Sequence, residues 1–363
     1  MRGGRRMTAR VSAVGCALLV IGALAGTGGG TTARAADAAV HLSMFVFAAP
    51  GHMDVPEGVA SAYMQAHPNV KIEFVESSNA KTFPQQLAAF KTTPDRPLID
   101  IGFYNADTAT KGLVNEMWLP LDASKIPNLK TIEQKFRQPQ DIGIEFAFGP
   151  FGLIYNKQAV KRPPTSYTDM WANPEFRHKV VLWDYVLEPV MLAALLNGGS
   201  GTNIMPGFRA WSEHADQIST FVHSNQEMEN ALVSGEGWLA FFDMQQATIW
   251  AKSGAPIATA IPKEGVVAWP LYIEVTKGET PEQLAVVYDL INNLISPETL
   301  LKYSAATYYV PTNTRLKLPE NVAALYPPGA LRRTVALDFL SLAKNTDGWN
   351  ELWDTMIKAK VGR

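Results

Sequence analysis

The sequence has almost no cysteine: Cys16 is the only one among 363 residues. A lipid-attachment cysteine should close an apolar stretch, whereas Cys16 precedes the apolar stretch 17–25, so we interpret it as a residue without a chemical role. No second cysteine follows it, so structural disulfide bonds within the chain are excluded. A chain of this length must instead be stabilised by a buried core, and it is long enough for two lobes.

Long apolar runs are also missing. After the N-terminal segment, no apolar run approaches the ~20 residues that a membrane span needs. Arginines precede the stretch 17–25, and Ala33-Arg34-Ala35 follows it, which is the pattern of a secretory signal peptide over 1–35. The pair Arg5-Arg6 leaves both Sec and twin-arginine export open. We expect cleavage near Ala35 and a periplasmic or secreted protein.

An excess of basic residues is also lacking. Once residues 1–35 are removed, 27 Lys and Arg remain against 34 Asp and Glu, a net charge of −7. Nucleic-acid binding depends on the neutralisation of phosphates by basic side chains, so this balance argues against a nucleic-acid partner.

Motifs of common enzymes are absent: there is no His-Glu-x-x-His, no Gly-x-Ser-x-Gly and no Gly-Lys-Ser/Thr phosphate loop. The six histidines are scattered, without the spacing of metal ligands. The glycine-rich run 198–201 follows a predicted helix instead of opening one, so it is typical of a helix end. We therefore expect neither an enzyme nor a cofactor or metal.

What the sequence does contain is an alternation of strands and helices. We predict strands over 41–47, 70–75 and 99–103, with helices over 56–65 and 83–90 between them. Such alternation predicts a largely parallel sheet covered by helices. The polar segment 122–141 then reads as a linker.

The stretch 152–184 forms one further unit with a turn signal at every junction. An apolar strand over 152–156 is followed, after two prolines, by the helix start Ser166-Tyr167-Thr168-Asp169. A second apolar strand over 180–183 delivers Asp184 at its carboxyl end, where ligands bind in open α/β sheets.

This unit resembles the extracellular solute-binding proteins of ABC importers, and within them the spermidine/putrescine-binding type. The likeness lies in the order of a strand, a Pro-Thr-Ser-Tyr-x-Asp-x-Trp segment over 164–171, Pro174-Glu175-Phe176 and another strand. A Pro-Lys-Glu-Gly turn before Trp269 and the run Tyr309-Val310-Pro311-Thr312-Asn313 continue it, so it extends from about Leu42 to the last helix.

The resemblance implies an α/β, two-lobe periplasmic-binding-protein fold of type II, with mostly parallel sheets flanked by helices and a ligand cleft between the lobes. We assign 1–35 to the signal peptide, 36–147 plus 270–307 to the N-terminal lobe, and 148–269 plus 308–363 to the C-terminal lobe. The expected function is capture of a small solute by lobe closure and its delivery to a membrane permease. We expect a monomer.

The resemblance also implies where the ligand binds. Carried over one position at a time, the family's ligand-binding positions correspond to Asn105, Asp107, Tyr185, Glu188, Asp243, Trp269 and Tyr309, with Asp184 adjacent. Trp269 corresponds to the ligand-stacking tryptophan. Two residues later, where polyamine binders place an aspartate, this chain has Leu271, so an amine-bearing, polyamine-like ligand is expected without the choice of spermidine or putrescine.

Other interpretations stay open at several of these positions. Asp107 and Asp243 can equally cap the helices that follow them, and Trp269 can be a core aromatic residue. The pair Tyr308-Tyr309 is compatible with ferric iron. An aminophosphonate or another zwitterion could bind helix N-termini at Ser77-Ser78 or Thr108. An exported acid–base enzyme using Asp107, Asp184 and Glu188 is the alternative from another class.

Overall fold

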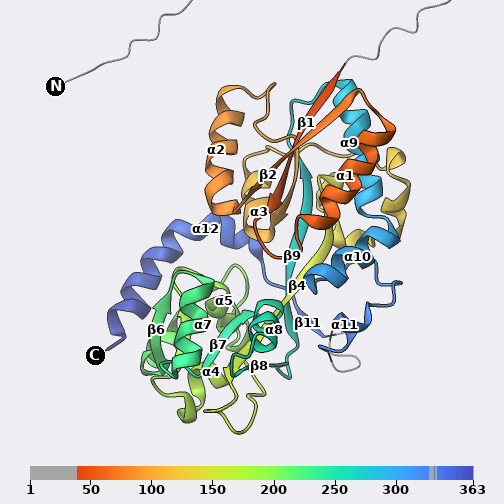
Figure 1. Cartoon of the computed structure of the whole chain (residues 1–363). Coiled ribbons are helices and arrows are strands. Elements are labelled where there is room, and N and C mark those ends of the chain that lie inside the picture. Colours follow the sequence, from red (N-terminus) through yellow and green to blue (C-terminus); the bar gives the residue numbers. More distant parts are fainter. Residues whose placement is uncertain (1–38, 327–330, 332, 363) are drawn as a thin grey trace, which may run out of the picture. The chain divides into compact units, whose positions relative to one another are not determined.

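The N-terminal part of the fold is built as the sequence predicts. The structure, a computed structural model, describes residues 39–326, 331 and 333–362, so the predicted signal peptide with Cys16 lies outside the described residues (Figure 1). Strands and helices alternate, in the order β1 (Val40–Phe47), α1 (Asp54–Ala66), β2 (Val70–Ser77), α2 (Asn79–Thr92), β3 (Ile101–Asn105) and α3 (Ala106–Val114). β1 pairs in parallel with both β2 and β3, because a helix returns the chain between strands.

The predicted linker contains four short 3-10 helices: Ala123–Lys125, Pro127–Thr131, Gln134–Phe136 and Pro139–Asp141. They lead into β4 (Gly143–Asn156), which is longer than the strand predicted over 152–156. All its residues except Phe151 are buried, so the strand reads as a continuous apolar run without the alternation of a half-exposed strand.

The second part of the chain again alternates helices and strands. Its elements are α4 (Asp169–Ala172), β5 (Val180–Trp183), α5 (Glu188–Leu196), α6 (Met205–Glu213), β6 (Ile218–Val222), α7 (Asn225–Ser234), β7 (Leu239–Asp243), α8 (Met244–Lys252) and β8 (Ile257–Ala260). β5 pairs in parallel with β6 and β7, while β4 pairs antiparallel with β7 and β8.

The chain then returns through a long strand and a mainly helical C-terminal part. The remaining elements are β9 (Val266–Val275), α9 (Pro281–Leu294), α10 (Pro297–Thr307), β10 (Val310–Pro311), α11 (Glu320–Ala323), β11 (Thr334–Val335) and α12 (Phe339–Leu352). A π-helical turn, Trp353–Ile357, and a 3-10 turn, Lys358–Lys360, follow α12. Among the described residues, no helix combines the length and apolar character needed to cross a membrane.

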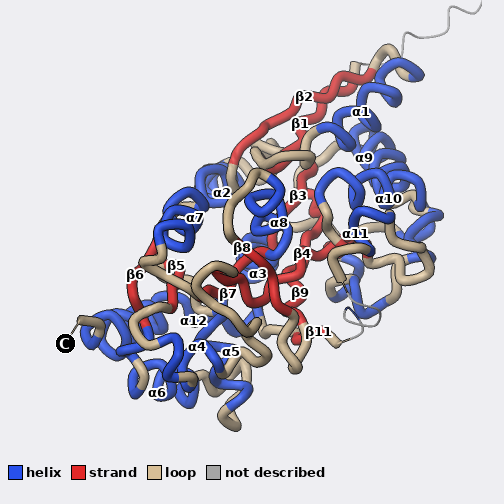
Figure 2. The backbone as a smooth tube through the Cα atoms, turned by 60° about the horizontal axis from the view of Figure 1, so that its bottom comes forward, coloured by secondary structure: helices blue, strands red, loops and turns tan. Residues whose placement is uncertain are grey.

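The strands join in the order β2-β1-β3-β9-β4-β7-β5-β6, with helices on both sides (Figure 2). Ladders toward the two ends of this order are parallel, whereas β9 pairs antiparallel with both β3 and β4. The mixed α/β sheet flanked by helices confirms the predicted two-lobe fold class. The expected parallel pairing is present toward both ends of the sheet. In the centre the pairing is antiparallel, because β4 and β9 run in opposite directions between the two parallel groups.

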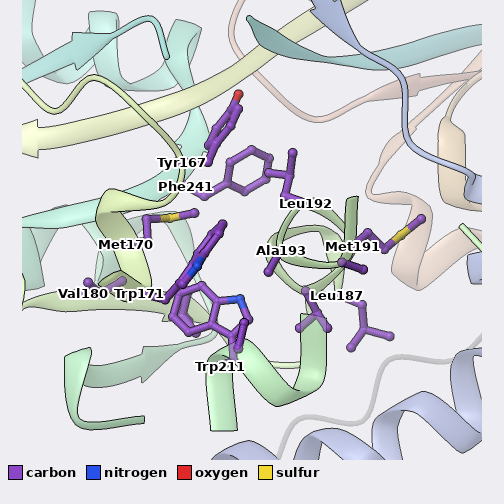
Figure 3. Close-up of a cluster of buried hydrophobic side chains, with 14 of the residues drawn as sticks. Tyr167, Met170, Trp171, Val180, Leu187, Met191, Leu192, Ala193, Trp211 and Phe241 are labelled. Atoms are coloured by element: carbon purple, nitrogen blue, oxygen red, sulfur yellow. The ribbon is translucent and has the colours of Figure 1, made fainter. Parts of the chain in front are cut away.

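Two large hydrophobic clusters share β4 and β9. In β4, Ile144 and Phe146 pack in one cluster with β1 and α9, whereas Leu153 and Tyr155 pack in the other with α5 and α6. Figure 3 shows part of the second cluster, where Trp171 and Trp211 lie with ring centroids 5.6 Å apart. The predicted lobe boundaries near 147 and 269 fall within these shared strands.

Candidate functional site

The Pro-Lys-Glu-Gly turn before Trp269 contacts the segment 164–171 directly. The Glu264 carboxylate in the Pro-Lys-Glu-Gly turn accepts a hydrogen bond from Ser166 Oγ at 2.5 Å and one from the Tyr167 amide at 3.4 Å. The Lys263 amide donates to the Thr165 carbonyl oxygen at 2.8 Å. These bonds fix the turn against the hydrophobic cluster of Trp171 and Trp211 and thereby position the strand that follows the turn.

Gly265 ends that turn in a conformation that favours glycine. Its φ is +103°, and a Cβ atom there would lie 2.1 Å from the Arg333 carbonyl oxygen. Backbone therefore approaches backbone at this position, and β9 begins at the next residue in pairing with β11. The result is a defined register for Trp269 four residues later.

Trp269 lies in β9 opposite Gly149 of β4 and is partly buried. Its ring packs 4.2 Å from the Phe151 ring and 6.3 Å from the Phe339 ring, measured between centroids. Phe151 in turn pairs with Asp243 of β7. Three neighbouring strands thus bring Trp269, Phe151 and Asp243 to the same part of the sheet.

Asp243 is both the last residue of β7 and the N-cap of α8. Its Oδ1 atom accepts hydrogen bonds from the amides of Gln245 at 2.8 Å and Gln246 at 3.4 Å, so the predicted capping role is confirmed. Within the described chain, its Oδ2 atom forms no hydrogen bond. Burial raises the pKa of the Asp243 carboxyl to about 6, because removal of water disfavours the charged form.

Trp269 and Asp243 line one cavity of about 190 Å³. Its other lining residues are four aromatic side chains, one aliphatic side chain and two amides: Phe151, Trp183, Phe241, Phe242, Val186, Asn225 and Gln246. We call this cavity the aromatic pocket. All its lining residues fall within 148–269, the range predicted as part of the C-terminal lobe.

The aromatic pocket has a distinct charge character. Among the described residues, neither Lys nor Arg lines it, and Asp243 supplies its one carboxylate. A larger cavity of about 1020 Å³, which includes Glu145 and Phe148, contains none of the eight predicted ligand-binding residues. The aromatic pocket is therefore the stronger candidate for the binding site.

Tyr309, the last predicted ligand residue near Asp243, does not line the pocket. Burial, and then the negative charge of Asp243, raises the pKa of the Tyr309 hydroxyl well above its usual value. Its ring lies edge-on to His52 at 5.3 Å, whereas the neighbouring Tyr308 hydroxyl accepts a hydrogen bond from Lys252 Nζ at 2.6 Å. The two adjacent tyrosines thus have different partners. Among the described residues, no group of three or more His, Cys, Asp and Glu side chains could hold a metal ion.

Asn105, Asp107 and Glu188 form a second group, at the facing first turns of α3 and α5. Asn105 caps α3 by accepting a hydrogen bond from the Thr108 amide at 2.9 Å, and Asp107 pairs with Lys111 at 2.9 Å. Glu188 is 4% exposed, and burial raises its pKa to about 7, with the Asp107 charge adding to this rise. None of the three predicted ligand residues lines the aromatic pocket.

Asp184 and Tyr185 contact the C-terminal end of the chain instead of the pocket. Asp184 Oδ1 accepts a hydrogen bond from Trp353 Nε1 at 2.9 Å, and its Oδ2 accepts one from Lys358 Nζ at 2.8 Å. The Tyr185 hydroxyl donates to Asp354 Oδ1 at 2.9 Å. The buried Asp184 carboxylate therefore accepts hydrogen bonds from two donors that lie 169 and 174 residues away in sequence, a separation that no local pattern reveals.

Leu271 explains the missing aspartate in structural terms. It is 2% exposed and packs in the cluster shared by β1, β3 and α9. Its neighbours in the sheet are Asn105 on β3 and Ala147 on β4. A carboxylate here would be buried among apolar side chains, so this position does not contribute charge to the aromatic pocket.

Sequence reasoning missed the aromatic walls of the pocket. Trp183 and Phe242 each precede a predicted acidic residue at the end of a strand, and Phe151 precedes the predicted strand 152–156. These residues belong to apolar strand ends that are typical of core packing, so no local signal in the sequence separated them from ordinary core residues.

Comparisons with known proteins agree on the class. The model of the family described as bacterial extracellular solute-binding protein matches residues 58–326. No curated protein sequence matches the chain.

Solved structures with this fold have different ligands named in their descriptions. An ABC transporter protein from Clostridium perfringens is 20% identical, with 88% of this chain and 99% of that chain covered and a TM-score of 0.71. An iron- and citrate-bound protein from Trichodesmium is 14% identical (87% and 99% covered, TM-score 0.69). A spermidine/putrescine substrate-binding protein from Streptococcus pneumoniae is 18% identical (86% and 99% covered, TM-score 0.67). At these identities the likeness concerns the fold alone.

Proposed function

Because the chain belongs to the bacterial extracellular solute-binding proteins, we propose that its solute carries an amine and binds in the aromatic pocket. As the solute-binding component of an ABC transporter, the protein binds a small molecule and delivers it to a membrane permease. Its family and fold are those of transport proteins and not of enzymes.

The observation that carries this proposal is the combination of five aromatic rings with one carboxylate and, among the described residues, no basic side chain in the pocket lining. An ammonium group over an aromatic face gains roughly 0.5–2 kcal/mol, the more so when it is desolvated. Asp243 Oδ2 is available as the counter-charge, since Oδ1 already caps α8. A cation therefore fits this lining better than an anion does.

We propose that the solute is captured by lobe closure, starting from one wall of the cleft. All lining residues belong to 148–269, so the solute first binds to the wall of the C-terminal lobe. Asn105 and Asp107 of the opposite lobe lie at the start of α3, whose Ala106 packs in the core of the C-terminal lobe. A solute that is bound more tightly when these surfaces meet shifts the population toward the closed form.

A zwitterionic solute is a second candidate, because the pocket also receives a helix N-terminus. Asn225 is the first residue of α7, a helix of ten residues whose N-cap is Ser224. The positive end of a helix favours an acidic group on the ligand. Competition of the bound amine by inorganic phosphate would support a zwitterion, and its absence would favour a simple amine.

The test is the substitution Trp269→Ala, followed by calorimetric titration with putrescine and with tetramethylammonium. We expect affinity for the cation that wild type binds to fall by roughly 1–2 kcal/mol, which is about 5- to 30-fold. The matched control is Trp238→Ala, which removes a partly buried tryptophan that packs under Lys179 outside the pocket. Equal affinity in wild type and in Trp269→Ala would show that the cation does not bind in the aromatic pocket.

A further inference from the structure

The walls of the aromatic pocket consist of stacked rings. Trp183 and Phe242 are nearly parallel, at 12° with centroids 5.8 Å apart, and Phe242 stacks on Trp250 at 10° and 5.2 Å. On the other side, Phe151 packs against Trp269 at 4.2 Å. Phe151 also contacts Phe242 at 6.4 Å, so the two groups of rings form one continuous aromatic lining.

Hydrogen-bond acceptors are scarce in this lining. Asp243 Oδ1 already accepts two amide hydrogen bonds, which leaves Oδ2 as the one free carboxylate oxygen among the described lining residues. The two amide side chains of the lining lie toward solvent, since Asn225 is exposed and Gln246 is partly exposed. A primary ammonium carries three N–H donors, and each donor left unpaired on burial costs free energy.

We propose that the pocket selects a fully methylated, quaternary ammonium head over a primary ammonium. This inference rests on the proposed function, because it names the kind of amine that the same site takes. A quaternary head has no N–H donor, so it needs no acceptor beyond the single counter-charge at Asp243. Its methyl groups present the positive charge directly to the rings of Trp183, Phe151 and Trp269, while Phe242, stacked between Trp183 and Trp250, supports the wall.

The size of the pocket agrees with such a head. A cavity of about 190 Å³ has room for several water molecules. Waters against aromatic walls form few hydrogen bonds, and their displacement by methyl groups is favourable. A trimethylammonium group with a short substituent is small enough to enter this space.

The experiment is calorimetric titration of the purified protein with tetramethylammonium chloride and, separately, with methylammonium chloride at equal ionic strength. We expect tetramethylammonium to bind at least about tenfold more tightly. Equal or tighter binding of methylammonium would overturn the selectivity while leaving the proposed function in place. Failure of both cations to bind, together with failure of putrescine, would overturn both.

Two variants assign the selectivity to the stacked wall. Trp183→Leu keeps an apolar side chain but removes the ring, and we expect the preference for tetramethylammonium to fall by about fivefold or more. Trp238→Leu, outside the pocket, should keep the wild-type preference. A preference unchanged in Trp183→Leu would contradict the role of the stacked rings, and the comparison of the two salts in wild type tests the proposal even if that variant does not fold.

Discussion

At the scale of single residues, Asp243 has two tasks on its two oxygen atoms. Oδ1 satisfies the amides of Gln245 and Gln246 at the start of α8, and Oδ2 is left for a ligand. The sequence left a choice between helix cap and ligand contact at this position. The structure makes that choice unnecessary, because a carboxylate can cap with one oxygen and bind a cation with the other.

The first prediction concerns the pH dependence of amine binding. Burial raises the pKa of Asp243 to about 6, so its negative charge is present above pH 6 and is lost as the pH falls through that value. Affinity for tetramethylammonium, whose own charge does not titrate, should therefore be higher at pH 7.5 than at pH 5. Titration calorimetry at both values measures this difference.

Two substitutions isolate Asp243 as the source of that dependence. Asp243→Asn keeps a helix-capping oxygen but removes the charge, so binding should be weak and nearly independent of pH. Asp338→Asn changes another N-cap aspartate, at the start of α12 and outside the pocket, and should preserve the wild-type pH profile. A flat profile in wild type would show that the Asp243 charge does not act on the ligand.

At the scale of elements, the turn before β9 sets the register that places Trp269. Gly265 and Gly254 both have a positive φ, +103° and +99°, but a Cβ atom would meet the Arg333 backbone only at Gly265. We predict that Gly265→Ala lowers the free energy of unfolding by roughly 2–4 kcal/mol, from backbone strain plus the contact. Gly254→Ala should lose only the strain, about 1 kcal/mol.

Urea unfolding of both glycine variants measures this difference. Equal losses would mean that the backbone of Arg333 moves away at little cost, and the turn would then not fix the start of β9. Gly265→Ala should also weaken amine binding, because Trp269 lies four residues later, in the strand that begins directly after Gly265.

A further prediction at this scale concerns the contact of α3 with α5. Burial raises the pKa of Glu188 from its ordinary value of 4.5 to about 7 in the folded protein, so Glu188 destabilises the fold fully above about pH 7 and no longer does so below about pH 4.5. Glu188→Gln should therefore stabilise the fold at pH 8, on the order of 1–3 kcal/mol, and this gain should vanish toward pH 4.5.

The matched control is Glu298→Gln, which changes an exposed first-turn glutamate of α10 that pairs with Lys302. Pairing with Lys302 lowers the pKa of Glu298, so this substitution should give no stabilisation at pH 8. Thermal unfolding at pH 8 and pH 5 distinguishes the two variants. A gain in Glu188→Gln that is the same at both pH values would contradict a buried charge.

At the scale of the whole molecule, the sequence predicted local elements well and long-range partners poorly. The strands and helices up to β3 are present because apolar periodicity and caps are local signals. The extent of β4 was underestimated, since a strand buried on both faces shows no alternation. The partners of Asp184 were beyond reach, because Trp353 and Lys358 approach it only in the folded chain.

The candidate site shows the same division. The resemblance identified Trp269 and Asp243, which lie together in the aromatic pocket. The same resemblance also pointed to Asp184 and Tyr185, whose side chains contact the C-terminal turns. Family position thus predicts where a residue lies on the fold, while the partners of its side chain depend on the rest of this particular chain.

We propose that this solute-binding protein takes a cationic amine in the pocket of Trp269 and Asp243. The most direct measurement is the thermal unfolding of the purified protein with putrescine, spermidine, methylammonium, tetramethylammonium, phosphate and ferric citrate. A ligand at ~100 times its dissociation constant stabilises the fold by roughly 2.7 kcal/mol, which raises Tm by several degrees. We expect such a rise with at least one of the cationic amines, and a much smaller rise in Asp243→Asn. No rise with any amine, or a rise only with phosphate or ferric citrate, would contradict it.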